Sequence, residues 1–191
     1  MKFHPIDILN RFDELLREKG LEFKNGIVIG GAAISILYRE ERFTQDIDLL
    51  TLIPQLIKEA SREFASKEQL ADDWFNNRVV NLDSCKPSGW GNDLVSLFEG
   101  SNLSLFSVSR KNLLRIKLFS ACDRPEGLTI DIPDIKSMNP SRAEILEAAQ
   151  WVKQEITRQR LAKREHQQKF PVKIMRLWPV RLSGHVFDTV A

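Results

Sequence analysis

The stretch Ile27-Val28-Ile29-Gly30-Gly31-Ala32-Ala33, continued by Arg42-Phe43-Thr44-Gln45-Asp46-Ile47-Asp48-Leu49-Leu50, decides the fold. A short apolar run between turn signals predicts a buried strand. The two glycines that end this run allow a close backbone approach where a helix begins. The unpaired N–H groups and the positive dipole end of that helix suit a phosphate. The second apolar run predicts another strand, on which alternate side chains share a face.

Two acids share one face of this second strand. Asp46 and Asp48 are separated by one residue, so they lie roughly 7 Å apart along the strand, while Ile47 and Leu49 face the core. Two carboxylates beside a phosphate cradle can hold a magnesium ion that bridges the protein and a triphosphate. A purely structural alternative is a helix that packs tightly through its glycines, followed by an edge strand with solvated acids. An apolar strand, however, has little structural reason to carry two acids on one face.

Two further polar residues precede the acid pair. Arg42 and Thr44 lie at the predicted mouth of the site, where an arginine can neutralise triphosphate charge and a hydroxyl can bind phosphate or order the loop. The charged residues 39–41 are interpreted as a solvated helix end. Gly30, Gly31, Arg42 and Thr44 are therefore the candidate phosphate-binding residues.

Length and composition set the outer limits. A chain of 191 residues suits one compact domain with a helical extension, and its net charge of +2 favours no particular partner. Cys85 and Cys122 lack metal-ligand spacing, which favours a reduced intracellular protein. No apolar run approaches the ~20 residues of a membrane span. We therefore expect a cytoplasmic protein without membrane contact.

Helices and strands alternate along the predicted chain. Apolar periodicity predicts helices over residues 5–19, 31–39, 54–65 and 109–121, and strands over residues 27–30, 94–98 and 103–108, of which the last two form a hairpin. Residues 131–135 contain a proline and are interpreted as a turn leading into a short helical segment. Ser141 and Glu144 match a capping box that opens a helix to about residue 164. This order predicts an α+β (α/β) fold, a mixed sheet packed by helices with a C-terminal helical extension.

Three other features have open interpretations. Lys117 lies in an apolar helix, from which a lysine stem commonly snorkels to solvent. Trp74 could stack on a base, but a buried anchor is the commoner role of tryptophan. The basic end of the last helix, around Arg158 and Arg160, could follow a nucleic-acid backbone, although cations at a helix C-terminus also need no partner.

The opening motif resembles the signature of the nucleotidyltransferase superfamily. It is similar in form to that of bacterial AbiEii-type toxin-like nucleotidyltransferases and their uncharacterised relatives, which carry a Thr-x-Asp-Ile-Asp-Leu stretch like residues 44–49. Looser similarities follow in the same order: residues 74–77, the Leu-Leu-x-x-Lys-Leu segment of residues 113–118, Arg124, residues 131–135 and Trp151-Val152. The resemblance spans about residues 26–152. We expect a nucleotidyltransferase-like domain over 1–138, a C-terminal helix over 139–170 that packs on it or extends from it, and a tail over 171–191.

This resemblance implies magnesium-dependent transfer of a nucleotidyl group from a nucleoside triphosphate to a hydroxyl. Asp46 and Asp48 would bind the metal, the Gly30-Gly31 backbone would hold the phosphates, and Lys117 would offset phosphate charge. Arg42 and Thr44 would complete the nucleotide site, with Asp131 and Arg124 as additional candidates.

A third acid on a neighbouring strand would bind a second ion in the full two-metal version. Residues 103–108 carry no acid, Asp93 and Glu99 flank residues 94–98, and Asp83 lies in a stretch without a clear pattern. Asp131 could approach the site, but a helix cap is the favoured interpretation.

Two functions follow from these patterns. The first is an active nucleotidyltransferase that modifies an RNA or protein acceptor, as the toxin-like member of a toxin–antitoxin or phage-defence pair with an antitoxin or regulator partner. The second is a nucleotide-binding or interaction module that has kept the fold and lost turnover, because no third acid is evident.

Overall fold

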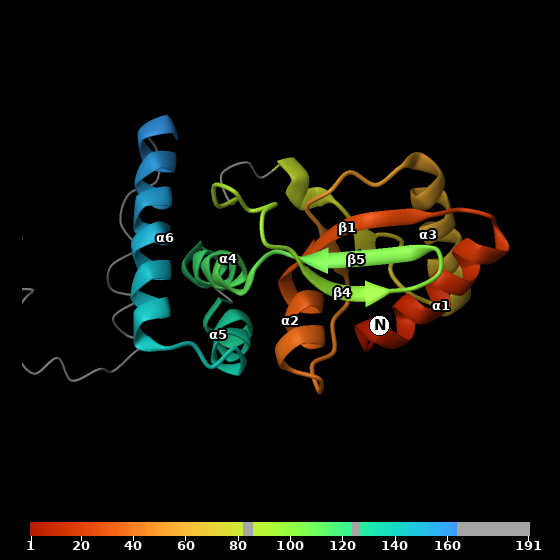
Figure 1. Cartoon of the computed structure of the whole chain (residues 1–191), viewed down its shortest axis with the longest axis horizontal. Coiled ribbons are helices and arrows are strands. Elements are labelled where there is room, and N and C mark those ends of the chain that lie inside the picture. Colours follow the sequence, from red (N-terminus) through yellow and green to blue (C-terminus); the bar gives the residue numbers. More distant parts are fainter. Residues whose placement is uncertain (82–85, 124–126, 164–191) are drawn as a thin grey trace, which may run out of the picture.

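The described part of the chain forms a five-stranded mixed sheet packed by six α-helices. A computed structural model of the chain describes residues 1–81, 86–123 and 127–163 (Figure 1). Along the chain the elements are α1 (Pro5–Glu18), β1 (Phe23–Ile29), α2 (Gly30–Tyr38), β2 (Ile47–Leu49), α3 (Gln55–Glu68), β3 (Phe75–Asn76), the 3₁₀ turn η1 (Arg78–Asn81), β4 (Val95–Glu99), β5 (Leu103–Ser107), α4 (Arg110–Asp123), α5 (Gly127–Ser137) and α6 (Arg142–Lys163). This arrangement confirms the predicted α+β class.

The sheet has the strand order β3-β2-β1-β5-β4. β1 is antiparallel to β2 and parallel to β5, while β2 is parallel to the two-residue strand β3. In this register Ile29, the last residue of β1, lies opposite Asp48 of β2. The end of β1, where the chain turns into α2, therefore meets the acidic strand directly.

An aromatic cluster fills the core between α1, α3 and the β2–β3 side of the sheet. Phe12 of α1 and Phe64 of α3 pack against Trp74, with ring centroids 5.2 and 5.3 Å from the indole. Trp74 is fully buried and its indole N–H donates to the Ser61 carbonyl at 2.9 Å. Trp74 is thus a buried anchor, and the alternative that it stacks on a base is wrong.

The last three helices form a separate layer beyond the end of the sheet. α4 contacts both α5 and α6, and Figure 1 shows α4 and α5 lying between α2 and α6. The predicted capping box opens α6: the Ser141 hydroxyl accepts the Glu144 N–H at 3.2 Å, and the Glu144 carboxylate accepts the Ser141 N–H at 2.7 Å. Within the described residues, no helix is both long and apolar enough to cross a membrane.

Residues 131–135 differ from the sequence prediction. They lie inside α5, which begins at Gly127 and continues through Pro133, so Asp131 is not a helix cap. The helical spacing places Asp131 and Asp134 on one side of α5, where both bind Lys117 of α4. A proline removes one hydrogen bond from a helix interior, and the two paired acids lie on either side of Pro133 in the sequence.

Parts of the sequence prediction fall outside the described residues. These are Asp83, Cys85, Arg124, the basic segment of residues 164–170 and the 171–191 tail.

The β4–β5 turn is fastened to α1 by a single carboxylate. Asp13 accepts the backbone N–H groups of Ser101, Asn102 and Leu103 at 3.0, 2.8 and 2.6 Å. A methyl group at Gly100 would clash with this carboxylate, so the turn needs glycine there.

We expect Asp13→Ala to lower the free energy of unfolding by about 2–3 kcal/mol, because three backbone donors lose a charged acceptor. Urea denaturation measures this change. The exposed neighbour Glu14 is the control, and Glu14→Ala should stay within ~0.5 kcal/mol of the wild type. Equal effects of the two substitutions would contradict the fastening role of Asp13.

Candidate active site

The site begins at the turn from β1 into α2. Gly30 has a φ of +73°, a conformation that L side chains rarely adopt, and no side chain caps the helix that starts there. The guanidinium of Arg42 occupies the space where a Cβ at Gly31 would lie. The first-turn N–H groups of α2 therefore remain available to an anion, and the positively charged Arg42 guanidinium lies beside them.

The two predicted acids stand next to this turn. Asp48 lies in β2 opposite Ile29, and a Cβ at Gly30 would come within 3.4 Å of Asp48 Oδ2. Asp46 precedes β2 and is exposed, and the Thr44 hydroxyl donates to the Asp46 carbonyl at 3.1 Å. The same hydroxyl is 3.4 Å from Asp46 Oδ1. Thr44 thus orders the loop that carries the exposed acid.

The pKa of Asp48 is raised above its ordinary value. Burial raises the pKa of the Asp48 carboxyl, and the nearby Asp46 charge raises this pKa further. A hydrogen bond from Asn76 acts in the opposite direction. A cation that binds between Asp46 and Asp48 would favour the ionised form of both carboxyls and would lower the raised pKa of Asp48.

Asn76 is a site residue that the sequence analysis missed. It lies in β3 directly opposite Asp48, and its side-chain Nδ2 donates to Asp48 Oδ1 at 3.1 Å. The strand beside β2 is therefore β3, and neither strand of the predicted hairpin adjoins β2. The segment of residues 74–77 was the available signal, since it follows the acidic strand and carries two asparagines.

The glycine turn and the acid pair line one cavity of about 560 Å³, within the ~300–1,000 Å³ typical of small-ligand sites, and Asn76 lies outside this lining. Its polar wall contains all seven of the main sequence candidates: Gly30, Gly31, Arg42, Thr44, Asp46, Asp48 and Lys117. Its apolar wall includes Phe43, Val79 and Ile130. Phe43 and Ile130 are also solvent-exposed, so the cavity has accessible apolar surface as well as charged groups.

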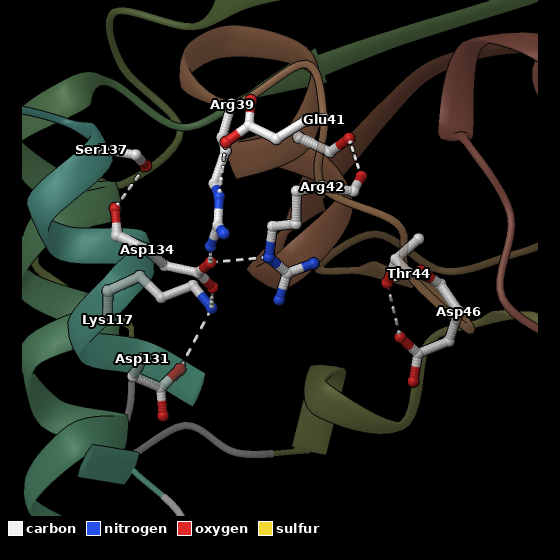
Figure 2. A network of polar contacts seen from close by, with 10 residues as sticks. Arg39, Glu41, Arg42, Thr44, Asp46, Lys117, Asp131, Asp134 and Ser137 are labelled. Atoms are coloured by element: carbon white, nitrogen blue, oxygen red, sulfur yellow. Dashed lines mark hydrogen bonds and ion pairs between the residues drawn. The ribbon is translucent and has the colours of Figure 1, made fainter. Parts of the chain in front are cut away.

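Lys117 belongs to a buried network of charges (Figure 2). Its ammonium lies 2.7 Å from Asp134 Oδ2 and 3.1 Å from Asp131 Oδ1, and the residue is only 3% exposed. The stem does not snorkel to solvent, so that interpretation is wrong. Two carboxylates of α5 hold the ammonium in place at the cavity wall.

Asp134 connects this lysine to the arginine that covers Gly31. Arg42 Nε donates to Asp134 Oδ1 at 2.6 Å, and Arg39 Nη1 lies 3.9 Å from the same oxygen. Figure 2 shows Arg42 and Lys117 converging on Asp134 from α2's loop and from α4. Arg42 and Lys117 line the cavity, whereas Asp131 and Asp134 do not. On this side the two cations therefore face the cavity and the two acids of α5 do not, an arrangement that favours an anionic ligand.

The donor set suits magnesium. Carboxylate oxygens are its preferred protein ligands, and it commonly binds through one or two carboxylates plus substrate phosphates. Asp46 and Asp48 supply that pair beside the helix N-terminus. The described part of the chain contains no group of three or more His, Cys, Asp or Glu side chains placed to share a metal ion. Asp131 is directed to Lys117, so it does not supply a third acid there.

Comparisons with known proteins give one structural likeness and one family match. A solved structure of an antigenic nucleotidyltransferase-like protein from Paracoccidioides brasiliensis shares 14% identity and a TM-score of 0.45, with 85% of this chain and 89% of that chain covered. No curated protein matches the chain. A family model matches residues 6–164, which include every element of the sheet and all the residues that line the cavity except Lys2. The chain belongs to the family described as nucleotidyltransferase of unknown function (DUF6036).

Proposed function

We propose that the protein is a magnesium-dependent nucleotidyltransferase that moves a nucleoside monophosphate group from a nucleoside triphosphate to a hydroxyl of an RNA or protein. The observation that carries this proposal is the register of β1 and β2. It places Asp48 against the end of the β1 strand, so that the acid pair and the Gly30-Gly31 turn border one cavity.

Each polar residue of the cavity has a role in this proposal. Asp46 and Asp48 would hold the ion, which when bound supplies positive charge to the triphosphate. The N–H groups at the start of α2 bind phosphate oxygens, and Arg42 and Lys117 offset the charge that develops on the leaving phosphates. Thr44 keeps the Asp46 loop ordered. The apolar wall with Phe43, Val79 and Ile130 leaves a surface for the base.

The test is calorimetric titration with each of the four ribonucleoside triphosphates, with and without magnesium. We expect magnesium-dependent binding by the wild type and its loss in the Asp46→Ala, Asp48→Ala double variant. An Asp7→Ala, Asp72→Ala double variant removes the same charge from exposed positions outside the cavity and should bind like the wild type. Equal binding by the two double variants, or no binding by the wild type, would contradict the proposal.

A non-catalytic nucleotide-binding module is the second candidate. The observation in its favour is Asn76, an amide at the position on β3 that faces Asp48. This module would bind nucleotide with magnesium and transfer no label to any acceptor.

The biological role proposed here follows the resemblance of residues 44–49 to AbiEii-type proteins. In this role the protein is a bacterial toxin or phage-defence component with an antitoxin or regulator partner. A neighbouring gene for a small DNA-binding regulator would support it.

A further inference from the structure

We infer that Lys2 is a further phosphate-binding residue of this cavity, a third cation beside Arg42 and Lys117 that contacts the phosphates of the bound nucleotide. This inference rests on the proposed function and adds a residue to it. Lys2 lies outside the residues 6–164 that the family model matches, so its role does not follow from family membership.

The position of Lys2 is set by the residue that follows it. Phe3 pairs with Thr44 in an antiparallel bridge, in which the N–H of each residue donates to the carbonyl of the other, at 2.8 and 3.0 Å. The Phe3 side chain is buried against Trp74, with ring centroids 6.0 Å apart. The backbone next to Lys2 is therefore fastened to the loop that carries Asp46.

This pairing turns Lys2 toward the cavity. Side chains alternate along an extended segment, so Lys2 and His4 point away from the face on which Phe3 lies. The His4 ring contacts the Phe43 ring, with centroids 6.3 Å apart, as expected for the next pair of residues in the same antiparallel register. Lys2, Phe43 and Gln45 all line the cavity, whereas Phe3 does not. The short bridge thus presents one lysine to the site.

Lys2 differs from the other two cations of the cavity wall in its charge balance. Asp134 pairs with both Arg42 and Lys117. Asp131 pairs with Lys117 as well, so carboxylates of α5 already match the positive charge of these two residues. Lys2 is exposed and forms no ion pair with any other residue that the structure describes. Of the three cations that line the cavity, Lys2 is therefore the one whose charge the described residues leave unmatched.

The phosphates of a nucleotide are the groups that this charge suits. A triphosphate keeps negative charge after a magnesium ion has bound, and the ammonium of lysine is a compact cation with three donors on a flexible stem. Because Lys2 is exposed and has no carboxylate to leave, it can reach a phosphate oxygen without breaking an ion pair. The resulting hydrogen bond has charge on both partners and is stronger than a neutral one.

The experiment is calorimetric titration, at low salt with magnesium, of non-hydrolysable analogues of the four ribonucleoside triphosphates. For each analogue that the wild type binds, we expect Lys2→Gln to lower the affinity by about 10-fold, the effect of losing one hydrogen bond to a charged group. Lys2→Arg keeps the charge and should restore most of the affinity. Lys153→Gln removes an exposed lysine of α6 outside this cavity and should bind like the wild type.

A salt series shows which part of the nucleotide Lys2 contacts. Dissolved ions screen exposed charges, over a distance that falls from roughly 10 Å at 0.1 M salt to about 3 Å at 1 M. The difference in affinity between the wild type and Lys2→Gln should therefore shrink across this range. The phosphates carry the charge of the nucleotide, so a difference that depends on salt in this way indicates a phosphate contact.

The outcomes separate the inference from the proposed function. If Lys2→Gln binds like the wild type while the Asp46→Ala, Asp48→Ala double variant does not bind, the inference is overturned and the proposed function stands. A loss that Lys2→Arg does not restore, or that is the same at low and high salt, would show that Lys2 does not act through its charge and would also overturn the inference. If the wild type binds none of the analogues, the proposed function fails, and the inference fails with it.

Discussion

Asp48→Asn should make the metal-free protein more stable and abolish its magnesium-dependent binding of nucleotide. Burial and the neighbouring Asp46 charge raise the pKa of Asp48, which means that the folded state binds the Asp48 proton more tightly than the unfolded state does. At neutral pH the ionised carboxylate therefore costs folding free energy. An asparagine has no charge to bury and can still accept the hydrogen bond of Asn76. The loss of a metal ligand should lower any transfer rate by at least ~100-fold.

Urea unfolding with EDTA and with magnesium plus nucleotide measures both effects. The gain in stability should shrink as the pH falls through the raised folded-state pKa of Asp48 toward the ordinary value of 3.8, because the wild-type carboxyl then takes up its proton. Magnesium affinity of the wild type should fall over the same pH range, since protons compete with the ion.

Asp46→Asn is the matched control for Asp48→Asn. Asp46 is exposed, so its substitution should remove magnesium dependence with little gain in stability. An Asp48→Asn variant that is less stable than the wild type in EDTA would show that the Asp48 carboxylate stabilises the fold.

Local sequence patterns predicted the half of the site that lies within one continuous stretch. The glycine turn and the acid pair could be recognised because a helix intervenes between two apolar runs. The period-two alternation predicted both acids on one strand, but β2 begins at Ile47, so only Asp48 lies on it and Asp46 lies in the loop before it. The capping box of α6 was predictable for the same reason, since its two residues are three apart. These features depend on neighbours in sequence.

The other half depends on contacts between distant segments. β3 has only two residues, too few for any periodicity, so nothing in residues 75–76 alone shows that Asn76 will lie beside Asp48. Pro133 argued against regular structure over residues 131–135, but that segment is helical and its two acids pair with Lys117 of α4. A lysine on an apolar helix face was ambiguous until the acids of α5 were placed against it. Tertiary contacts decided each of these cases.

Asp134→Ala is expected to produce the largest loss of stability, about 3–5 kcal/mol in the free energy of unfolding. The Asp134 carboxylate is fully buried and binds Arg42 at 2.6 Å and Lys117 at 2.7 Å. Removing one partner of a buried ion pair leaves an uncompensated charge, which costs far more than the net contribution of the pair. Lys117 would keep Asp131, but Arg42 would lose its ion pair with α5. Urea denaturation measures this loss.

The same substitution tests how the wall of the cavity that carries Arg42 and Lys117 is built. Asp134 is a positioning residue, since it fixes two cations that line the cavity without lining the cavity itself. Below the unfolding temperature of the variant, its affinity for magnesium–nucleotide should therefore fall about 10-fold, equivalent to ~1.4 kcal/mol. Asp123→Ala removes an exposed acid of the cavity wall on α4 and should change stability by less than ~0.5 kcal/mol. If Asp134→Ala loses stability but keeps full affinity, Arg42 and Lys117 do not need this carboxylate to face the phosphates. If it loses both, the charge network that holds α5 against α4 is also the support of the nucleotide site.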